Sequence, residues 1–118
     1  MSEKLFNEEL DLSKLMRIEA YYSHGMSWDI DDICKDFDLN KTKHIESVCV
    51  GKWAELHIFL NDEGLQAIKN NVTNAEYERI LEDKILTVSG AEWTDDYKWP
   101  TNATYWDKNW NVLEEETF

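Results

Sequence analysis

The stretch "HIESVCVGKWAELHIFL", residues 44–60, predicts the β-hairpin from which the fold can be built outward. Val50 and Trp53 flank Gly51-Lys52, and a glycine at the first of two turn positions is typical of a type II′ turn. Because successive side chains of a strand point to opposite faces, this turn places one nearly apolar set on a common face. The set is Ile45, Ser47, Cys49, Ala54, Leu56, Ile58 and Leu60. We expect this face to lie against the core.

Two amphipathic segments before the hairpin predict helices. Residues 12–23 carry apolar side chains at mixed three- and four-residue spacing, and His24-Gly25 follows as a stop signal. In "SWDIDDICKDFDLN", residues 27–40, an apolar stripe repeats at helical spacing, and Ser27 is available as the N-cap. The stripe consists of Ile30, Ile33, Cys34 and Phe37. We expect the stripe to pack inward.

The segments after the hairpin predict a further helix and more strands. Residues 61–71 have the pattern of one helical turn or a loop, and Thr73 with Glu76 forms a capping-box signal for a helix that ends near residue 85. The remainder alternates enough for two or three strands, with a turn at Asp107-Lys108-Asn109.

These elements predict an α+β fold: an antiparallel sheet with two or three helices packed on one face. The chain has 118 residues, four glycines, one proline and no linker-like segment. A chain of this length can bury a substantial core. We therefore expect residues 1–118 to form a single compact acidic domain.

The charge balance limits the classes of partner. Acidic residues outnumber basic ones by 25 to 12, which gives a formal net charge of −13. A field of this sign repels nucleic acid and anionic membranes and attracts basic partners, so we expect no direct binding to nucleic acid or to a membrane. No signal-peptide pattern or membrane-length apolar run is present, so we expect the chain to work in the cytoplasm of a bacterium or an infected host cell.

The sequence gives little support to catalysis. It contains no G-x-S-x-G elbow, phosphate-binding loop or dinucleotide fingerprint. Cys34 and Cys49 stand apart, outside any CxxC spacing, and we expect them to be reduced core thiols without nucleophilic activation. We therefore expect no catalytic residues and no cofactor.

A metal site is a weaker alternative in the predicted hairpin. Its register brings together four side chains whose imidazole and carboxylate groups suit zinc or iron. They are His44, Glu46, Glu55 and His57. Their spacing matches no established metal motif, and such residues are common on a solvated sheet face, so we expect no bound metal.

The aspartates of residues 27–40 are the main functional lead: Asp29, Asp31, Asp32, Asp36 and Asp38. Aspartate is a poor residue for a helix interior, and only those in the first turn gain from the helix dipole. The sequence leaves three interpretations open. The aspartates form a solvated face, they belong to a helix-turn-helix over residues 21–48, or they imitate phosphates. Acids at 29, 32 and 36 rise about 4.5 and 6 Å apart along a helix, comparable with the ~3.4 Å charge spacing of a DNA strand.

A second acidic and aromatic region covers "EWTDDYKWPTNATYWDKNW", residues 92–110. Tryptophan and tyrosine beside carboxylates resemble the anchors and polar rim of a protein interface, although large aromatics also fill cores. The candidate contacts in this region are Asp95, Asp96, Trp99, Trp106 and Asp107. A third acidic run, residues 114–116, has the character of a solvated tail.

In size, charge and composition the chain resembles the small acidic inhibitors of phages and bacteria. These include DNA-mimic antirestriction and anti-CRISPR proteins and the immunity proteins that block toxic nucleases. The resemblance implies a protein–protein inhibitor that occupies the nucleic-acid-binding surface of a basic nuclease or other nucleic-acid-binding protein. A helix-turn-helix regulator and a small enzyme or metal-binding protein are the alternatives.

Overall fold

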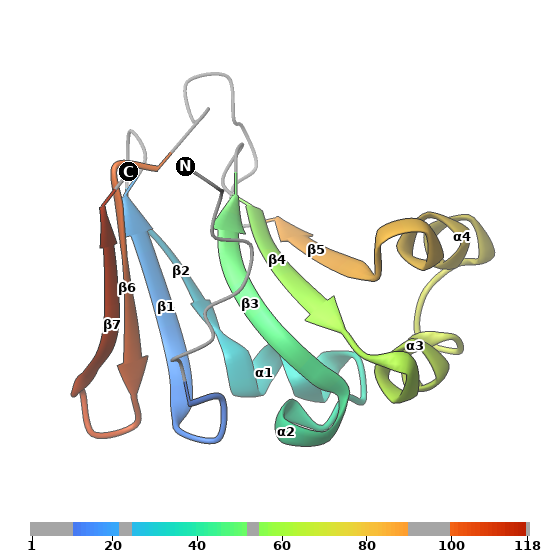
Figure 1. Cartoon of the computed structure of the whole chain (residues 1–118), viewed down its shortest axis with the longest axis horizontal. Coiled ribbons are helices and arrows are strands. Elements are labelled where there is room, and N and C mark those ends of the chain that lie inside the picture. The colour runs from blue at the N-terminus through green and yellow to red at the C-terminus, as the bar shows by residue number, and fades with distance from the viewer. Residues whose placement is uncertain (1–10, 22–24, 52–54, 90–99, 118) are drawn as a thin grey trace.

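The computed structural model describes residues 11–21, 25–51, 55–89 and 100–117, and these residues form two antiparallel sheets. The four-stranded sheet has the order β2-β1-β6-β7, and the three-stranded sheet has the order β3-β4-β5 (Figure 1). The strands are β1 Leu15–Tyr21, β2 Gly25–Asp29, β3 Ile45–Gly51, β4 Glu55–Leu60, β5 Ile85–Ser89, β6 Asn102–Asp107 and β7 Val112–Thr117. The helices are α1 Ile30–Asp36, α2 Lys41–His44, α3 Asp62–Ile68 and α4 Asn74–Asp83.

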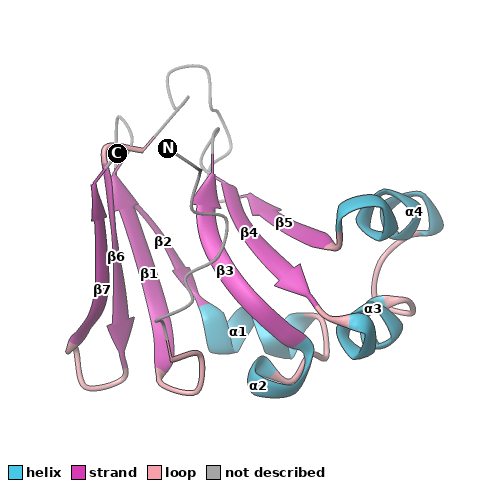
Figure 2. Ribbon diagram, in the orientation of Figure 1, coloured by secondary structure: helices cyan, strands magenta, loops and turns pink. Residues whose placement is uncertain are grey.

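One hydrophobic core joins the two sheets. Ile18 and Tyr105 of the four-stranded sheet and Leu56 and Ile58 of the other are completely buried and belong to the same cluster, together with Ile30 of α1. Figure 2 shows the strands as two separate groups, with α1 and α2 at the lower end and α3 and α4 beside the three-stranded sheet. The α+β class and the antiparallel pairing are confirmed.

The predicted single sheet is wrong, because the strands divide into two sheets. The helices are also shared between them. Helix α1 contacts β1 and β2, whereas α3 contacts β4 and α4 contacts β5. The expectation that all helices cover one face of one sheet is not confirmed.

The predicted helix over residues 12–23 is wrong, because most of this segment is strand β1. A β-bulge between Leu15 and Arg17 breaks the two-residue alternation. As a result Leu15 and Ile18, three residues apart, are both completely buried. A bulged strand therefore shows the three-residue spacing that is typical of a helix. Strand β2, which contains Ser27, was also missed.

The β3–β4 hairpin is confirmed, but its predicted register is wrong. Gly51 pairs with Glu55, and the predicted turn residue Lys52, with Trp53 and Ala54, lies outside the described residues. Val48 pairs with Ile58 and Val50 with Leu56, and all four are buried. The expected register would instead have placed Ser47 and Cys49 on that face. The observed one buries two β-branched valines there, which removes more apolar surface from water.

Helix α1 confirms the inward stripe. Ile30, Ile33 and Cys34 are buried, and Phe37 is half-buried at the C-cap. The N-cap is Asp29 rather than Ser27, because the Asp29 side chain accepts a hydrogen bond from the backbone N–H of Asp32.

The later elements follow local signals. The capping box of α4 is confirmed, since Thr73 and Glu76 bond reciprocally. Residues 61–71 form a longer helix than one turn, α3, whose N-cap Asn61 accepts from the N–H of Gly64. The turn after β6 is also confirmed. Residues 114–116 are not a tail: they lie in β7, where the Glu116 carboxylate accepts a hydrogen bond from the Tyr105 hydroxyl at 2.7 Å.

Candidate partner-binding surface

Two of the five predicted aspartates have local roles in α1 and its surroundings. The Oδ1 atom of Asp29 caps the helix, 3.0 Å from the N atom of Asp32. The Oδ1 atom of Asp31 lies 3.0 Å from the Nζ atom of Lys41, which also donates to the Leu15 carbonyl at 2.7 Å. These two carboxylates are therefore explained by the stability of the fold.

The remaining three aspartates form what we call the acidic face: Asp32 and Asp36 of α1, and Asp38 in the turn that follows. All three side chains are exposed, and within the described ranges none of their carboxylates makes a hydrogen bond or an ion pair. Asp38 has a left-handed backbone with a φ of 55°, which aspartate tolerates better than most residues. Asp32 lies in the first turn of α1, where the helix dipole favours its charge, whereas Asp36 at the last position has no comparable structural explanation.

The second predicted region is described only in part. Asp95, Asp96 and Trp99 lie outside the described residues. Asp107 ends β6, and its carboxylate accepts the backbone N–H groups of Asn109 and Asn111, each at 2.8 Å. The bond from Asn111 is the main reason why the pKa of Asp107 is lowered from 3.8. Asp107 is thus an anion that organises the β6–β7 turn.

The two predicted regions meet at a cavity. Its volume is about 630 Å³, and its walls include Asp31 from the first region and Asp107 from the second. We call it the lysine pocket, because Lys14, Lys41 and Lys108 also line it. Figure 1 shows why these segments meet: the turn before β1, the helices α1 and α2, and the β6–β7 turn all lie at the lower end of the molecule.

Trp106 belongs to a cluster on the outer face of the four-stranded sheet. Its Nε1 atom donates to Glu19 at 2.9 Å, and the ring of Trp110 meets it edge-on at 5.9 Å between centroids. The guanidinium of Arg17 bonds Glu19 at 3.1 Å and lies 5.8 Å from the centroid of the Trp110 ring. We call Arg17, Glu19, Trp106 and Trp110 the aromatic surface. Trp110 is 57% exposed, which suits a contact residue.

The sequence interpretation missed three of these four residues. Arg17 and Glu19 were assigned to a helix, although their alternation with Ile18 and Ala20 was the available signal of a strand with a polar outer face. Trp110 was expected at the start of a strand, but it lies in the turn with a left-handed φ of 64°.

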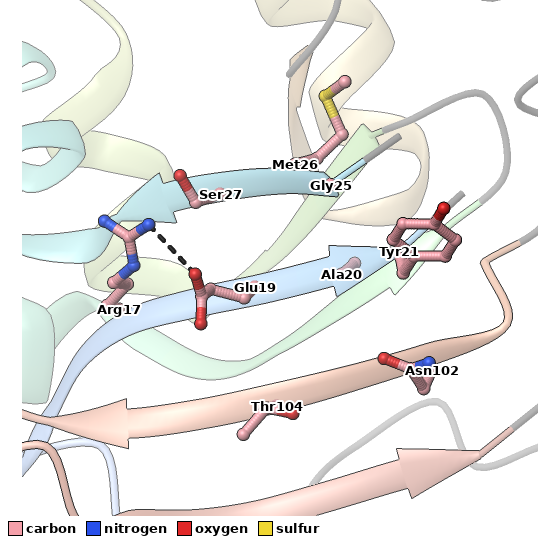
Figure 3. Close-up of a pocket in the computed structure, with 9 residues that line it drawn as sticks. All are labelled: Arg17, Glu19, Ala20, Tyr21, Gly25, Met26, Ser27, Asn102 and Thr104. Carbon is pink, nitrogen blue, oxygen red and sulfur yellow. Dashed lines mark hydrogen bonds and ion pairs between the residues drawn. The ribbon is translucent and has the colours of Figure 1, made fainter. Parts of the chain in front are cut away.

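A second, shallower cavity adjoins the aromatic surface. Its volume is about 360 Å³, and Figure 3 shows the bonded pair of Arg17 and Glu19 on β1, with Tyr21 further along the same strand and Asn102 and Thr104 on the neighbouring β6. The Glu19 oxygens are both engaged, one by Arg17 and the other by Trp106. The described lining therefore offers polar contacts from Ser27, Asn102 and Thr104.

The residues proposed for a metal do not converge. His44 ends α2, where its Nδ1 atom accepts the N–H of Asn40 at 2.9 Å. His57 lies in β4 opposite Cys49, and its ring is 3.5 Å from the Glu55 carboxylate. Over the described residues, no three His, Cys, Asp or Glu side chains gather closely enough to hold a metal ion. The predicted grouping of all four is wrong: Glu55 and His57 are neighbours on one strand, but the other two depended on the predicted register to join them.

The thiols are not activated. Burial raises the pKa of both Cys34 and Cys49 to about 11, so both are protonated at neutral pH. Cys34 is a core residue, as expected, whereas Cys49 is half-buried on the other face of β3.

The helix-turn-helix alternative loses its structural basis. Its first helix is strand β1, and the segment that would carry its recognition helix comprises the four-residue α2 and strand β3.

We found no match to the chain among protein-family models, curated proteins or solved structures. None of the helices in the described ranges combines the length and the apolar character needed to cross a membrane.

Proposed function

We propose that the protein binds a basic partner protein through the acidic face and blocks the nucleic-acid-binding surface of that partner. It acts as an inhibitor in the cytoplasm of a bacterium or an infected host cell, and it is not an enzyme. One observation carries the proposal: Asp32 and Asp36 are exposed, one turn apart, with no hydrogen bond or ion pair from their carboxylates to any described residue.

The position of Asp36 disfavours a purely structural role, whereas Asp32 lies in the first turn of α1, where a negative charge is favourable. Asp36 is the last residue of α1, where a negative charge opposes the helix dipole. Two carboxylates four residues apart also repel each other. The unfavourable charge of Asp36 and the repulsion between the two carboxylates are offset if a basic surface pairs with them in a complex.

The rest of α1 suits a preformed contact surface. Ile30 is completely buried, Ile33 is nearly so, and Asp29 caps the helix, so the backbone that carries Asp32 and Asp36 is held in place. The two residues rise about 6 Å apart along the helix, which is of the same order as the ~3.4 Å axial charge spacing of one DNA strand. A rigid surface loses less conformational entropy when it binds.

The aromatic surface supplies a second contact region. Trp110 lies in the β6–β7 turn, at the same end of the molecule as α1. Exposed tryptophans are common binding hot spots, while exposed charges around them steer association and set specificity. We assign Trp110 and Trp106 as anchors and the acidic face as the charged rim.

The first experiment is a pull-down from nuclease-treated host lysate, followed by binding and competition assays with each basic protein that salt releases. Support requires that the protein displaces nucleic acid from the captured partner. If no captured protein loses nucleic-acid binding when the chain is added, the proposal is wrong.

A charge-reversal pair then locates the interface. The double variant Asp32→Lys/Asp36→Lys should weaken partner binding by more than tenfold, about 1.4 kcal/mol. The matched control is Glu78→Lys/Glu82→Lys, because these residues are also exposed, four apart and on a helix, α4. The control should weaken binding less than about threefold. Equal losses would show that only net charge matters and would contradict the assignment to α1.

A further inference from the structure

The lysine pocket concentrates positive charge in an acidic protein. Lys14 precedes β1, Lys41 begins α2 and Lys108 lies in the β6–β7 turn, yet all three line one cavity of about 630 Å³. The chain has 12 basic residues among 118, so this cavity collects a quarter of them. A volume of this size lies in the range of small-molecule sites, roughly 300–1,000 Å³.

The protein itself engages both oxygens of one pocket carboxylate, Asp107, and one oxygen of the other, Asp31. The Oδ1 atom of Asp31 accepts from Lys41 at 3.0 Å. The Oδ1 atom of Asp107 accepts two backbone N–H groups of its turn, and its Oδ2 atom accepts from the Asn111 side chain at 3.2 Å. These oxygens already accept hydrogen bonds from nearby groups of the protein. They therefore compete less with a bound anion for the lysine ammonium groups.

The lysines, in contrast, retain donors. Across the described part of the chain, the ammonium groups of Lys14 and Lys108 make no hydrogen bond or ion pair. Lys41 uses two of its three N–H groups, on Leu15 and Asp31. Donors without a protein acceptor on the walls of one cavity are available to a bound anion.

We propose that the lysine pocket binds a small molecule that carries one or two phosphate groups. Lys14 and Lys108 bind the phosphate oxygens, and Lys41, held by Leu15 and Asp31, supplies its third N–H. The Asn109 side chain and the apolar stem of Met16 line the same cavity and offer contacts to the rest of the ligand. This site is independent of the acidic face and of the partner proposed above.

The test uses the whole chain and three defined ligands: inorganic pyrophosphate, adenosine diphosphate and citrate. Isothermal titration at about 0.15 M salt should give saturable binding of at least one phosphate ligand with a Kd below about 1 mM. Tighter binding of the nucleotide would support a site that also holds an organic group, and equal binding would support recognition of phosphate alone. Citrate binding as tightly as pyrophosphate would overturn the assignment to phosphate.

A double variant assigns the binding to the pocket. Lys14→Gln/Lys108→Gln should weaken phosphate binding at least tenfold, while circular dichroism shows an unchanged fold. The control Lys35→Gln/Lys69→Gln removes the same charge from exposed lysines outside the pocket and should change Kd less than about twofold. Equal weakening in both variants, or no saturable binding by the unmodified protein, would overturn the proposal.

Discussion

The acidic face and the lysine pocket lie at the same end of the molecule but carry opposite charges. Among the described residues, the carboxylates of the acidic face have no partner, whereas in the pocket the ammonium groups of Lys14 and Lys108 have none and Lys41 is held by Leu15 and Asp31. Asp31 and Lys41 form the boundary, since their ion pair joins α1 to α2. A net charge of −13 therefore does not describe a uniformly negative surface, because the fold separates the two signs.

The two regions also differ in how they are assembled. The acidic face comes from one continuous segment, residues 32–38, most of it on a helix with a regular apolar stripe. The lysine pocket comes from three segments that are distant in the sequence, around residues 14, 41 and 108. The positions of the charges on α1 follow from the geometry of one helix. The lysines of the pocket are brought together only by the tertiary fold.

Among the stability changes, the largest should come from Lys41→Met, which removes the ion pair between the acidic face and the lysine pocket. The methionine keeps most of the apolar stem, but the Leu15 carbonyl and Asp31 both lose a donor. We expect the free energy of unfolding to fall by about 1–2 kcal/mol, as for a partly buried hydrogen bond. Urea denaturation followed by circular dichroism measures the change.

The control for this variant is Lys43→Met in the same helix. Lys43 pairs with Glu63 at 3.7 Å, and both side chains are well exposed. An exposed pair of this kind contributes little, so we expect a loss below about 0.5 kcal/mol. If Lys41→Met and Lys43→Met destabilise the protein equally, Lys41 does not join α1 to α2 in the way described.

A smaller effect should separate the structural aspartates of α1 from those assigned to a partner. Asp29→Ala removes the N-cap and should cost about 1 kcal/mol. Asp36→Asn removes a charge that opposes the helix dipole and should stabilise the protein by a few tenths of a kcal/mol, roughly 0.3. Urea denaturation of the two variants gives both values. A destabilising Asp36→Asn would mean that Asp36 serves the fold, which would weaken its assignment to the acidic face.

The features that the sequence predicted correctly depend on neighbouring residues. Each of these features is formed by residues that are close together in the sequence. They are the stripe of α1, the capping box of Thr73 and Glu76, and the turn at Asp107. The exposed Asp32 and Asp36 follow directly from the stripe, because they lie on the opposite side of the same helix.

The features that the sequence did not predict depend on irregular or distant geometry. The bulge after Leu15 gives a strand the spacing of a helix, and that error hid Arg17 and Glu19 of the aromatic surface. The pairing of Gly51 with Glu55, instead of Val50 with Trp53, reversed the expected faces of β3 relative to β4. Lys14, Lys41 and Lys108 come together only after the β6–β7 turn and α2 reach the start of β1.

The smallest expected effect concerns Asp107, the carboxylate that the lysine pocket shares with the β6–β7 turn. Its pKa is lowered from 3.8, chiefly by the hydrogen bond from the backbone of Asn111, with a further contribution from Lys14. A carboxyl whose pKa is lower in the folded than in the unfolded state stabilises the protein above the unfolded pKa, and that stabilisation is lost as the pH falls through the folded pKa.

Asp107→Asn should therefore be less stable than the unmodified protein at pH 6, and the difference should shrink as the pH falls below about 4. Asparagine keeps an oxygen acceptor for the turn, so the pH-dependent part of the difference reports the charge rather than the shape of the side chain. Urea midpoints of both proteins between pH 6 and pH 2 measure it. A difference that stays constant or widens toward acid pH would mean that the Asp107 anion is not stabilised by its turn, and its oxygens would then be free to compete with phosphate in the lysine pocket.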